Sequence, residues 1–129
     1  MAKELKIIVE RWIYKAEIDI KTVQTLLDSK QLLPESICFH AQQAVEKYLK
    51  AFLVSKDIDP PRTHNIGILL NECGKVNSGF LAFDDAAALT EYAVEARYPD
   101  EYFPPTQQEA VESSNIAHKL RDFTLPLLQ

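Results

Sequence analysis

The sequence predicts an all-α protein, an antiparallel up-and-down helical bundle of four long helices plus one short helix. Apolar residues recur at helical spacing in several separate segments. No segment alternates apolar and polar residues as a strand would. The connecting segments are short enough to join antiparallel neighbours. A chain of 129 residues, 47% of them hydrophobic, can fill a single core, so we expect one domain over residues 1–129.

The first predicted helix covers residues 3–29. Its apolar residues follow one another at the spacing that is typical of one face of a long amphipathic helix. They are Val9, Ile13, Ala16, Ile20, Val23 and Leu27. Pro34 suits the first turn of a second helix, which we expect to end near Ser55.

The second helix contains the stretch CFHAQQAVEKYLKAFL, residues 38–53, in which hydrogen-bonding side chains interrupt the apolar ones. Helical geometry places Lys47 almost opposite the apolar face, and Gln42 and Glu46 at its boundary. That face consists of Cys38, Ala41, Val45, Tyr48, Leu49 and Phe52.

Three further apolar residues of the second helix, Phe39, Leu53 and Val54, fall outside this face. A helix that is apolar on more than one side usually meets a second neighbour, such as another subunit.

The third helix is short and lies in NIGILLNECG, residues 65–74. Asn65 or Thr63 is the candidate N-cap, and Gly74 is the expected stop. A fourth helix is predicted from Phe80 to Arg97, with Leu89, Ala93 and Ala96 facing the core and Tyr92 beside them.

The last helix opens with TQQE, a capping box from Thr106 to Glu109. Its apolar face consists of Ile116, Leu120, Phe123 and Leu127.

The composition excludes several classes of function. A net charge of −5 argues against a broad nucleic-acid surface, although a local basic pocket remains compatible with it. Only three glycines are present, so a glycine-rich phosphate loop is excluded. No apolar run approaches the ~20 residues that a membrane span needs. The charged N-terminal segment and two cysteines, Cys38 and Cys73, favour a cytoplasmic protein with free core thiols.

Two groups of residues are candidates for ligand binding. His40, Gln43 and Lys47 recur at helical spacing, which fits either a groove that reads a polar ligand or a solvated helix face. Arg62 and His64 precede a helix start, where a forked cation and free N–H groups favour an anion. The alternative is that Thr63 or Asn65 merely caps the helix, with His64 packed over it.

Arg97 is a third candidate, at the expected end of the fourth helix. The helix dipole alone explains a cation there. The aromatic residues that follow, Tyr98, Tyr102 and Phe103, fit either a stacked base or closure of the end of the bundle.

A metal site is not expected, because the three histidines, His40, His64 and His118, show no ligand spacing. No nucleophile–base pair can be picked out either, so we predict no cofactor and no catalytic residue from spacing alone.

The order of these pieces resembles the HEPN domain family over nearly the whole chain. The segments that carry the resemblance are AEIDIKTVQTLL, ESICFHAQQAVEKYLKAFLV, THNIGILL and LTEYAVEARYPD, followed by a capped last helix. The resemblance implies an antiparallel helical bundle that is often a homodimer. Many such proteins accompany a small nucleotidyltransferase in a two-gene, often toxin–antitoxin, system, and others are RNA-cleaving toxins that act without metal.

The catalytic members of the family carry an arginine, four to six residues, and then a histidine. Here Arg97 is followed by Tyr102 and Phe103 where the histidine would stand. Arg62 is too close to His64, and no histidine follows Arg121. The resemblance therefore implies binding of nucleotide or RNA and partnership, without catalysis by the family's motif.

We accordingly predict a non-catalytic, homodimeric nucleotide- or RNA-binding module that partners a small nucleotidyltransferase. The predicted ligand groove is lined by His40, Gln43, Lys47, Arg62, His64 and Arg97. One alternative is a metal-independent ribonuclease that uses Arg97 with Tyr102 or His118. The other is a pure protein-interaction module.

Overall fold

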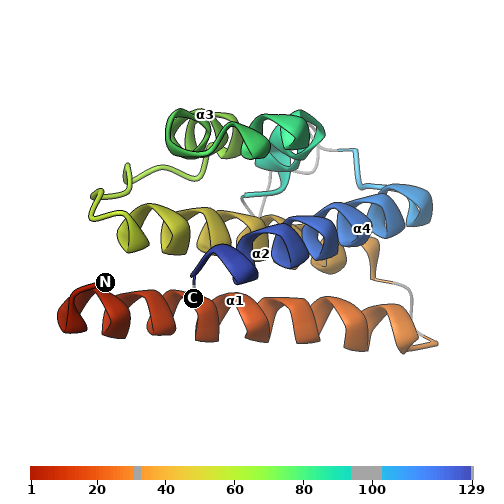
Figure 1. The fold of residues 1–129 in the computed structure, drawn as a ribbon. Helices are drawn as coiled ribbons and strands as arrows, with labels where there is room; N and C mark the ends of the chain where they lie inside the picture. Colours follow the sequence, from red (N-terminus) through yellow and green to blue (C-terminus); the bar gives the residue numbers. More distant parts are fainter. Residues whose placement is uncertain (31–32, 94–102, 129) are drawn as a thin grey trace.

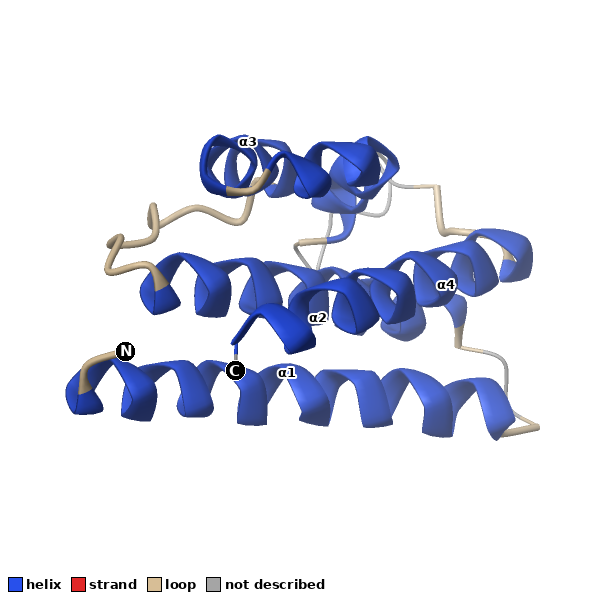
Figure 2. Ribbon diagram, in the orientation of Figure 1, coloured by secondary structure: helices blue, strands red, loops and turns tan. Residues whose placement is uncertain are grey.

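The computed structural model describes residues 1–30, 33–93 and 103–128. They contain helices and no strand, which confirms the all-α class (Figures 1 and 2). The elements in chain order are α1 (Lys3–Asp28), α2 (Pro34–Ser55), α3 (Ile66–Val76), the 3₁₀ helix η1 (Ser78–Tyr92), α4 (Gln107–Thr124) and a 3₁₀ turn η3 (Leu125–Leu128).

Helix α2 is the centre of the molecule, because it packs against α1, α3, η1 and α4. In Figure 1, α1 and α2 lie side by side and run in opposite directions, while α3 and η1 lie on the other side of α2. All six residues of its predicted apolar face are fully or almost fully buried. The predicted core face of α1 also faces inward, with Val9, Ala16, Ile20 and Val23 buried.

The central position of α2 explains its surplus of apolar residues. Leu53 is fully buried and Val54 is 7% exposed within this single chain. The second neighbour that the sequence calls for is therefore supplied by elements of the same chain. Phe39, the third of these residues, is only half-buried in the single chain, and the homodimer remains a prediction.

Two predicted helix starts are confirmed. The side chain of Asn65 accepts a hydrogen bond from the backbone N–H of Ile68, so Asn65 is the N-cap of α3. Thr106 and Glu109 form the expected capping box at the start of α4, each side chain accepting from the other residue's backbone N–H. These contacts satisfy N–H groups that a helix start leaves without a partner.

The predicted stop of α3 at Gly74 is wrong, because α3 continues to Val76. A Cβ atom on Gly74 would overlap the side chain of Leu81 in η1. This glycine therefore serves close packing between α3 and η1, rather than the left-handed turn that often ends a helix.

The fourth helix also differs from its prediction. It is a 3₁₀ helix that starts at Ser78, and the backbone leaves helical geometry at Phe83, with φ −99° and ψ 31°. Its inward-facing residues recur every third position, which matches three residues per turn. They are Phe80, Phe83, Ala86, Leu89 and Tyr92. Ala96, Arg97 and the predicted end of this helix lie outside the described residues.

Candidate ligand groove

Two polar clusters form around buried carboxylates on the packed helices. In the first, the Asp19 cluster, Nδ1 of His40 lies 2.9 Å from one carboxylate oxygen of Asp19 and Nζ of Lys47 lies 2.5 Å from the other. The Asp19 side chain is 8% exposed. Lys47, which the sequence placed opposite the core, is thus held against α1 by this ion pair.

The second, the Glu46 cluster, consists of Gln42, Glu46, Lys50 and His64. Oε1 of Glu46 lies 2.7 Å from Nδ1 of His64, and its Oε2 accepts a hydrogen bond from Lys50 at 3.1 Å. Gln42 donates to Glu46 and to the backbone oxygen of His64. These contacts tie α2 to the loop before α3.

Gln42 and Glu46 were predicted at the boundary of the apolar face of α2, and the structure buries both almost completely. The reason is that the chain after α2 turns back over this side of the helix. The side chains of both Gln42 and Glu46 have hydrogen-bond partners, which offsets the cost of burying them.

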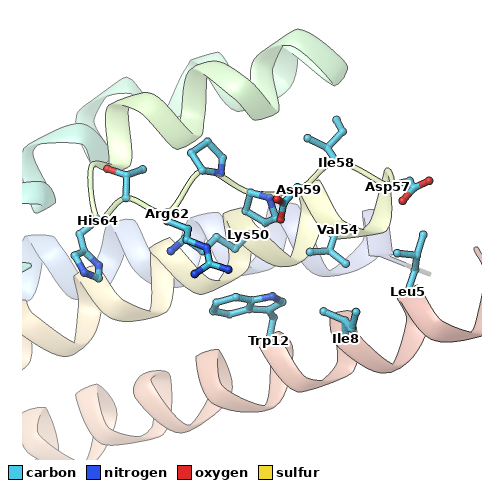
Figure 3. A pocket seen from close by; sticks show the side chains of 13 residues that line it. Leu5, Ile8, Trp12, Lys50, Val54, Asp57, Ile58, Asp59, Arg62 and His64 are labelled. Carbon is cyan, nitrogen blue, oxygen red and sulfur yellow. The ribbon is translucent and has the colours of Figure 1, made fainter.

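A groove of about 640 Å³ opens beside the Glu46 cluster (Figure 3). Its walls come from the first half of α1, the last turns of α2 and the loop that joins α2 to α3. The lining residues are Leu5, Ile8, Trp12, Lys50, Val54, Asp57, Ile58, Asp59, Pro60, Pro61, Arg62, Thr63 and His64. This volume is in the range of pockets that hold small molecules.

One end of the groove combines an aromatic ring with three basic side chains. Nζ of Lys50 lies 5.6 Å from the centroid of the Trp12 ring, within reach of a cation–π contact. Arg62 hangs from the loop above Lys50 and Trp12 (Figure 3). It has no ion-pair or hydrogen-bond partner among the residues that the structure describes. His64 completes this end, with 68% of its side chain exposed.

The Glu46 carboxylate fixes the orientation of the His64 ring. Because a carboxylate only accepts hydrogen bonds, Nδ1 of His64 carries a hydrogen and donates it to Glu46. The other nitrogen, Nε2, is then an acceptor in the neutral ring and a donor once the ring is protonated.

The structure separates the predicted site residues into two groups. Arg62 and His64 line the groove together. His40 and Lys47 do not line it, because both face Asp19. Gln43 donates to the side chain of Gln42 at 2.6 Å and also lies outside the lining. Arg97 lies outside the described residues.

The family comparison agrees with this fold. The family model described as HEPN domain matches residues 9–127. The chain belongs to the HEPN domain family. No curated protein and no solved structure gives a match to this HEPN chain. None of the helices in the described parts of the chain has the length and apolar character needed to cross a membrane.

At the basic end of the groove in this HEPN domain, sequence reasoning missed two residues, Trp12 and Lys50. Leu5, Ile8 and Trp12 form a second apolar stripe on α1 at helical spacing. This stripe is the feature of the sequence that indicates a second contact surface at Trp12. Lys50 stands four residues after Glu46, the favourable order for a helical ion pair. That spacing indicates the pair but not the groove beside it.

A third polar contact lies away from the groove. Glu17 of α1 accepts hydrogen bonds from Tyr48 of α2 at 2.6 Å and from Nε of Arg121 of α4 at 2.8 Å. Partial burial raises the pKa of Glu17, but the hydrogen bonds from Arg121 and Tyr48 outweigh it and leave the pKa below 4.5. This contact links three helices of the HEPN fold.

The two cysteines are free and buried, as predicted. Burial raises the pKa of both thiols, that of Cys73 to about 12. Neither thiol is therefore a reactive nucleophile near neutral pH. Among the described residues, no three carboxylate, histidine or cysteine side chains are grouped as a metal ion would require.

Proposed function

We propose that this HEPN domain binds a nucleotide in the groove between α1, the end of α2 and the loop before α3. The main observation behind this proposal is that the Trp12 ring lies near Lys50, Arg62 and His64 at one end of the groove. The groove has a volume that suits a small molecule. The family's association with nucleotides and RNA points in the same direction.

The chemistry of the two partners matches. A base stacked on a tryptophan contributes about 1–3 kcal/mol, and stacking accepts any base. The guanidinium fork of Arg62 fits the oxygens of a phosphate and is not committed to a carboxylate of the described chain. Lys50 adds a charged donor, although Glu46 already neutralises part of its charge, and His64 adds a polar ring at the same end.

The proposed role is binding without catalysis by the family's motif. No histidine follows any arginine at four to six intervening residues in this sequence. We further propose that the chain acts as a homodimer and partners a small nucleotidyltransferase in a two-gene, toxin–antitoxin-like system. Copurification with the product of a neighbouring nucleotidyltransferase gene would test the partnership.

Trp12 provides the first test, because it is the single tryptophan of the chain and its fluorescence reports directly on the groove. We expect titration with AMP to change this fluorescence in a saturable way. Arg62→Ala should weaken binding about tenfold, as loss of a charge-assisted phosphate contact requires.

Arg11→Ala is the matched control. The substitution removes the same charge as Arg62→Ala, and Arg11 is next to Trp12 in the sequence. Arg11 lines a separate hollow, however, together with Ile7 and Tyr14. It should leave the affinity for AMP within about twofold. Equal affinities for wild type and Arg62→Ala would refute the groove as a nucleotide site.

A second candidate function is metal-independent cleavage of RNA, and the Glu46–His64 pair is the observation that favours it. A buried carboxylate that orients an exposed histidine is the arrangement of a general base. His118, the histidine considered with Arg97, instead contacts the backbone oxygen of Ser114 within α4. Cleavage of RNA in excess EDTA that is lost in His64→Ala would establish this alternative.

The third candidate is a pure protein-interaction module. It would be favoured if neither AMP nor RNA changes the fluorescence of Trp12 and no cleavage occurs.

A further inference from the structure

The groove has charges of opposite sign at its two ends. Lys50, Arg62 and His64 lie toward one end, Asp57 lies at the other, and Asp59 lies on the loop between them (Figure 3). A site built for a continuous nucleic-acid strand is expected to be basic along its whole length. This groove is basic at one end only, and two carboxylates belong to the rest of its lining.

Backbone contacts fix the distance between the two ends. The His64 ring is bonded to Glu46, whereas the backbone N–H of Asp57 donates to the oxygen of Val54 at 2.9 Å. Glu46 and Val54 are both in α2, so at 1.5 Å per residue they are about 12 Å apart along the helix.

The middle of the groove is apolar on the side of the two helices. Ile8 and Val54 face it there, and Ile58 of the loop also belongs to its lining. An uncharged, flat group that continues from the Trp12 ring would be covered here, whereas a phosphate would lose its hydration.

We propose, on the basis of the function proposed above, that the ligand is a free mononucleotide with its phosphate at the basic end. The two carboxylates then exclude a continuous strand. Phosphates recur about every 3.4 Å along a stacked strand, so a strand that fills about 12 Å carries phosphates to the acidic end. Beyond its phosphate, a mononucleotide has only hydroxyl and amino groups. These groups can donate hydrogen bonds to the carboxylates of Asp57 and Asp59.

The test compares AMP with a circular oligoadenylate, which offers the same base but has no terminal nucleotide. Trp12 fluorescence is measured for wild type and for Asp57→Asn/Asp59→Asn at one salt concentration. Asparagine suits position 57, because the residue there has a positive φ of 59°. The change therefore removes charge without straining the loop.

Asp84→Asn/Asp85→Asn is the matched control. It changes the net charge by the same amount, and both residues are exposed on η1 outside the groove lining.

We expect wild type to bind AMP and to bind the circle at least about tenfold more weakly. The Asp57/Asp59 variant should gain about tenfold in affinity for the circle, while its affinity for AMP stays within about threefold. The control variant should resemble wild type for both ligands.

Each other outcome overturns the inference. If wild type binds the circle as tightly as AMP, or if the two double variants behave alike toward the circle, the nucleotide site stands but its restriction to mononucleotides is wrong. If neither ligand binds wild type, the nucleotide-binding function fails and the inference fails with it.

Discussion

The Asp19 cluster and the Glu46 cluster share three residue types and differ in their surroundings. Each joins one buried carboxylate to one histidine and one lysine. In the Asp19 cluster the histidine is 28% exposed, and in the Glu46 cluster it is 68% exposed. Only the second cluster borders the groove.

The difference comes from the elements that supply the partners. Asp19 is on α1 and its partners are on α2, so two rigid helices hold all three side chains. Glu46 receives His64 from a loop, which leaves one side of that ring open. The same residue types therefore make a helix–helix contact in one place and the wall of a candidate site in the other.

The largest expected effect is loss of stability in Glu46→Ala. The change leaves Lys50, whose side chain is 10% exposed, without its carboxylate. Removing one partner of a buried ion pair typically costs about 3–5 kcal/mol in the free energy of unfolding. Urea denaturation measures this cost. Glu72→Ala is the control, because its pair with Lys75 is on the surface and should contribute less than about 1 kcal/mol.

If Glu46→Ala and Glu72→Ala destabilise the protein equally, the Glu46 cluster is not the buried network described above.

Asp19→Ala should destabilise the protein less, by about 2 kcal/mol, because the side chain of Lys47 is 19% exposed, against 10% for Lys50, and can regain water. It should leave the affinity for AMP unchanged, since the cluster does not line the groove. Denaturation and Trp12 fluorescence measure the two properties separately. A loss of AMP affinity in a variant that is still folded would place the ligand on the Asp19 side of α2.

The two histidines offer the sharpest comparison of ligand binding. His64→Ala should weaken AMP binding about tenfold, because the His64 ring lines the groove and is oriented by Glu46. His40→Ala should change the affinity less than about twofold, because His40 faces Asp19 rather than the groove. Equal effects of the two variants would mean that the loop does not contribute to the site.

The smallest effect concerns pH and Glu17, the carboxylate of α1 that lies outside both clusters. Its folded-state pKa lies below 4.5, so the ionised form stabilises the fold above that pH. The contribution is lost as the pH falls through the folded-state pKa. Wild type should be about 1 kcal/mol more stable than Glu17→Gln at neutral pH and should lose this advantage at acid pH. Denaturation at several pH values checks this, and a pH-independent difference would contradict it.

Much of the fold was predictable from local rules. The bounds of α2 and the capping box at Thr106 follow from proline placement and cap chemistry, which act within one turn of helix. The 3₁₀ helix was missed because apolar residues at every third position also approximate a helix of 3.6 residues per turn. Gly74 was misread because only its contact with Leu81 reveals why a side chain is excluded there.

The candidate site was predictable only where a residue's role depends on its neighbours in the chain. Arg62 and His64 were predicted as ligand-binding residues from a local signal, a cation and a histidine before a helix start, and both line the groove. Trp12 and Lys50 were not predicted, because the groove exists only where the chain after α2 turns back along α2, opposite α1.

By itself, the sequence determined the helical class, the single domain that we expect, the family and most helix ends, because periodicity and caps are properties of adjacent residues. Tertiary structure alone decided which polar residues of α2 are buried and which carboxylate each cation meets. The physical reason is that burial and charge pairing depend on side chains brought together from distant segments. The sequence does not distinguish the roles of His40 and His64. In the structure His40 joins α2 to α1 through Asp19, whereas His64 lies on the loop at the edge of the groove.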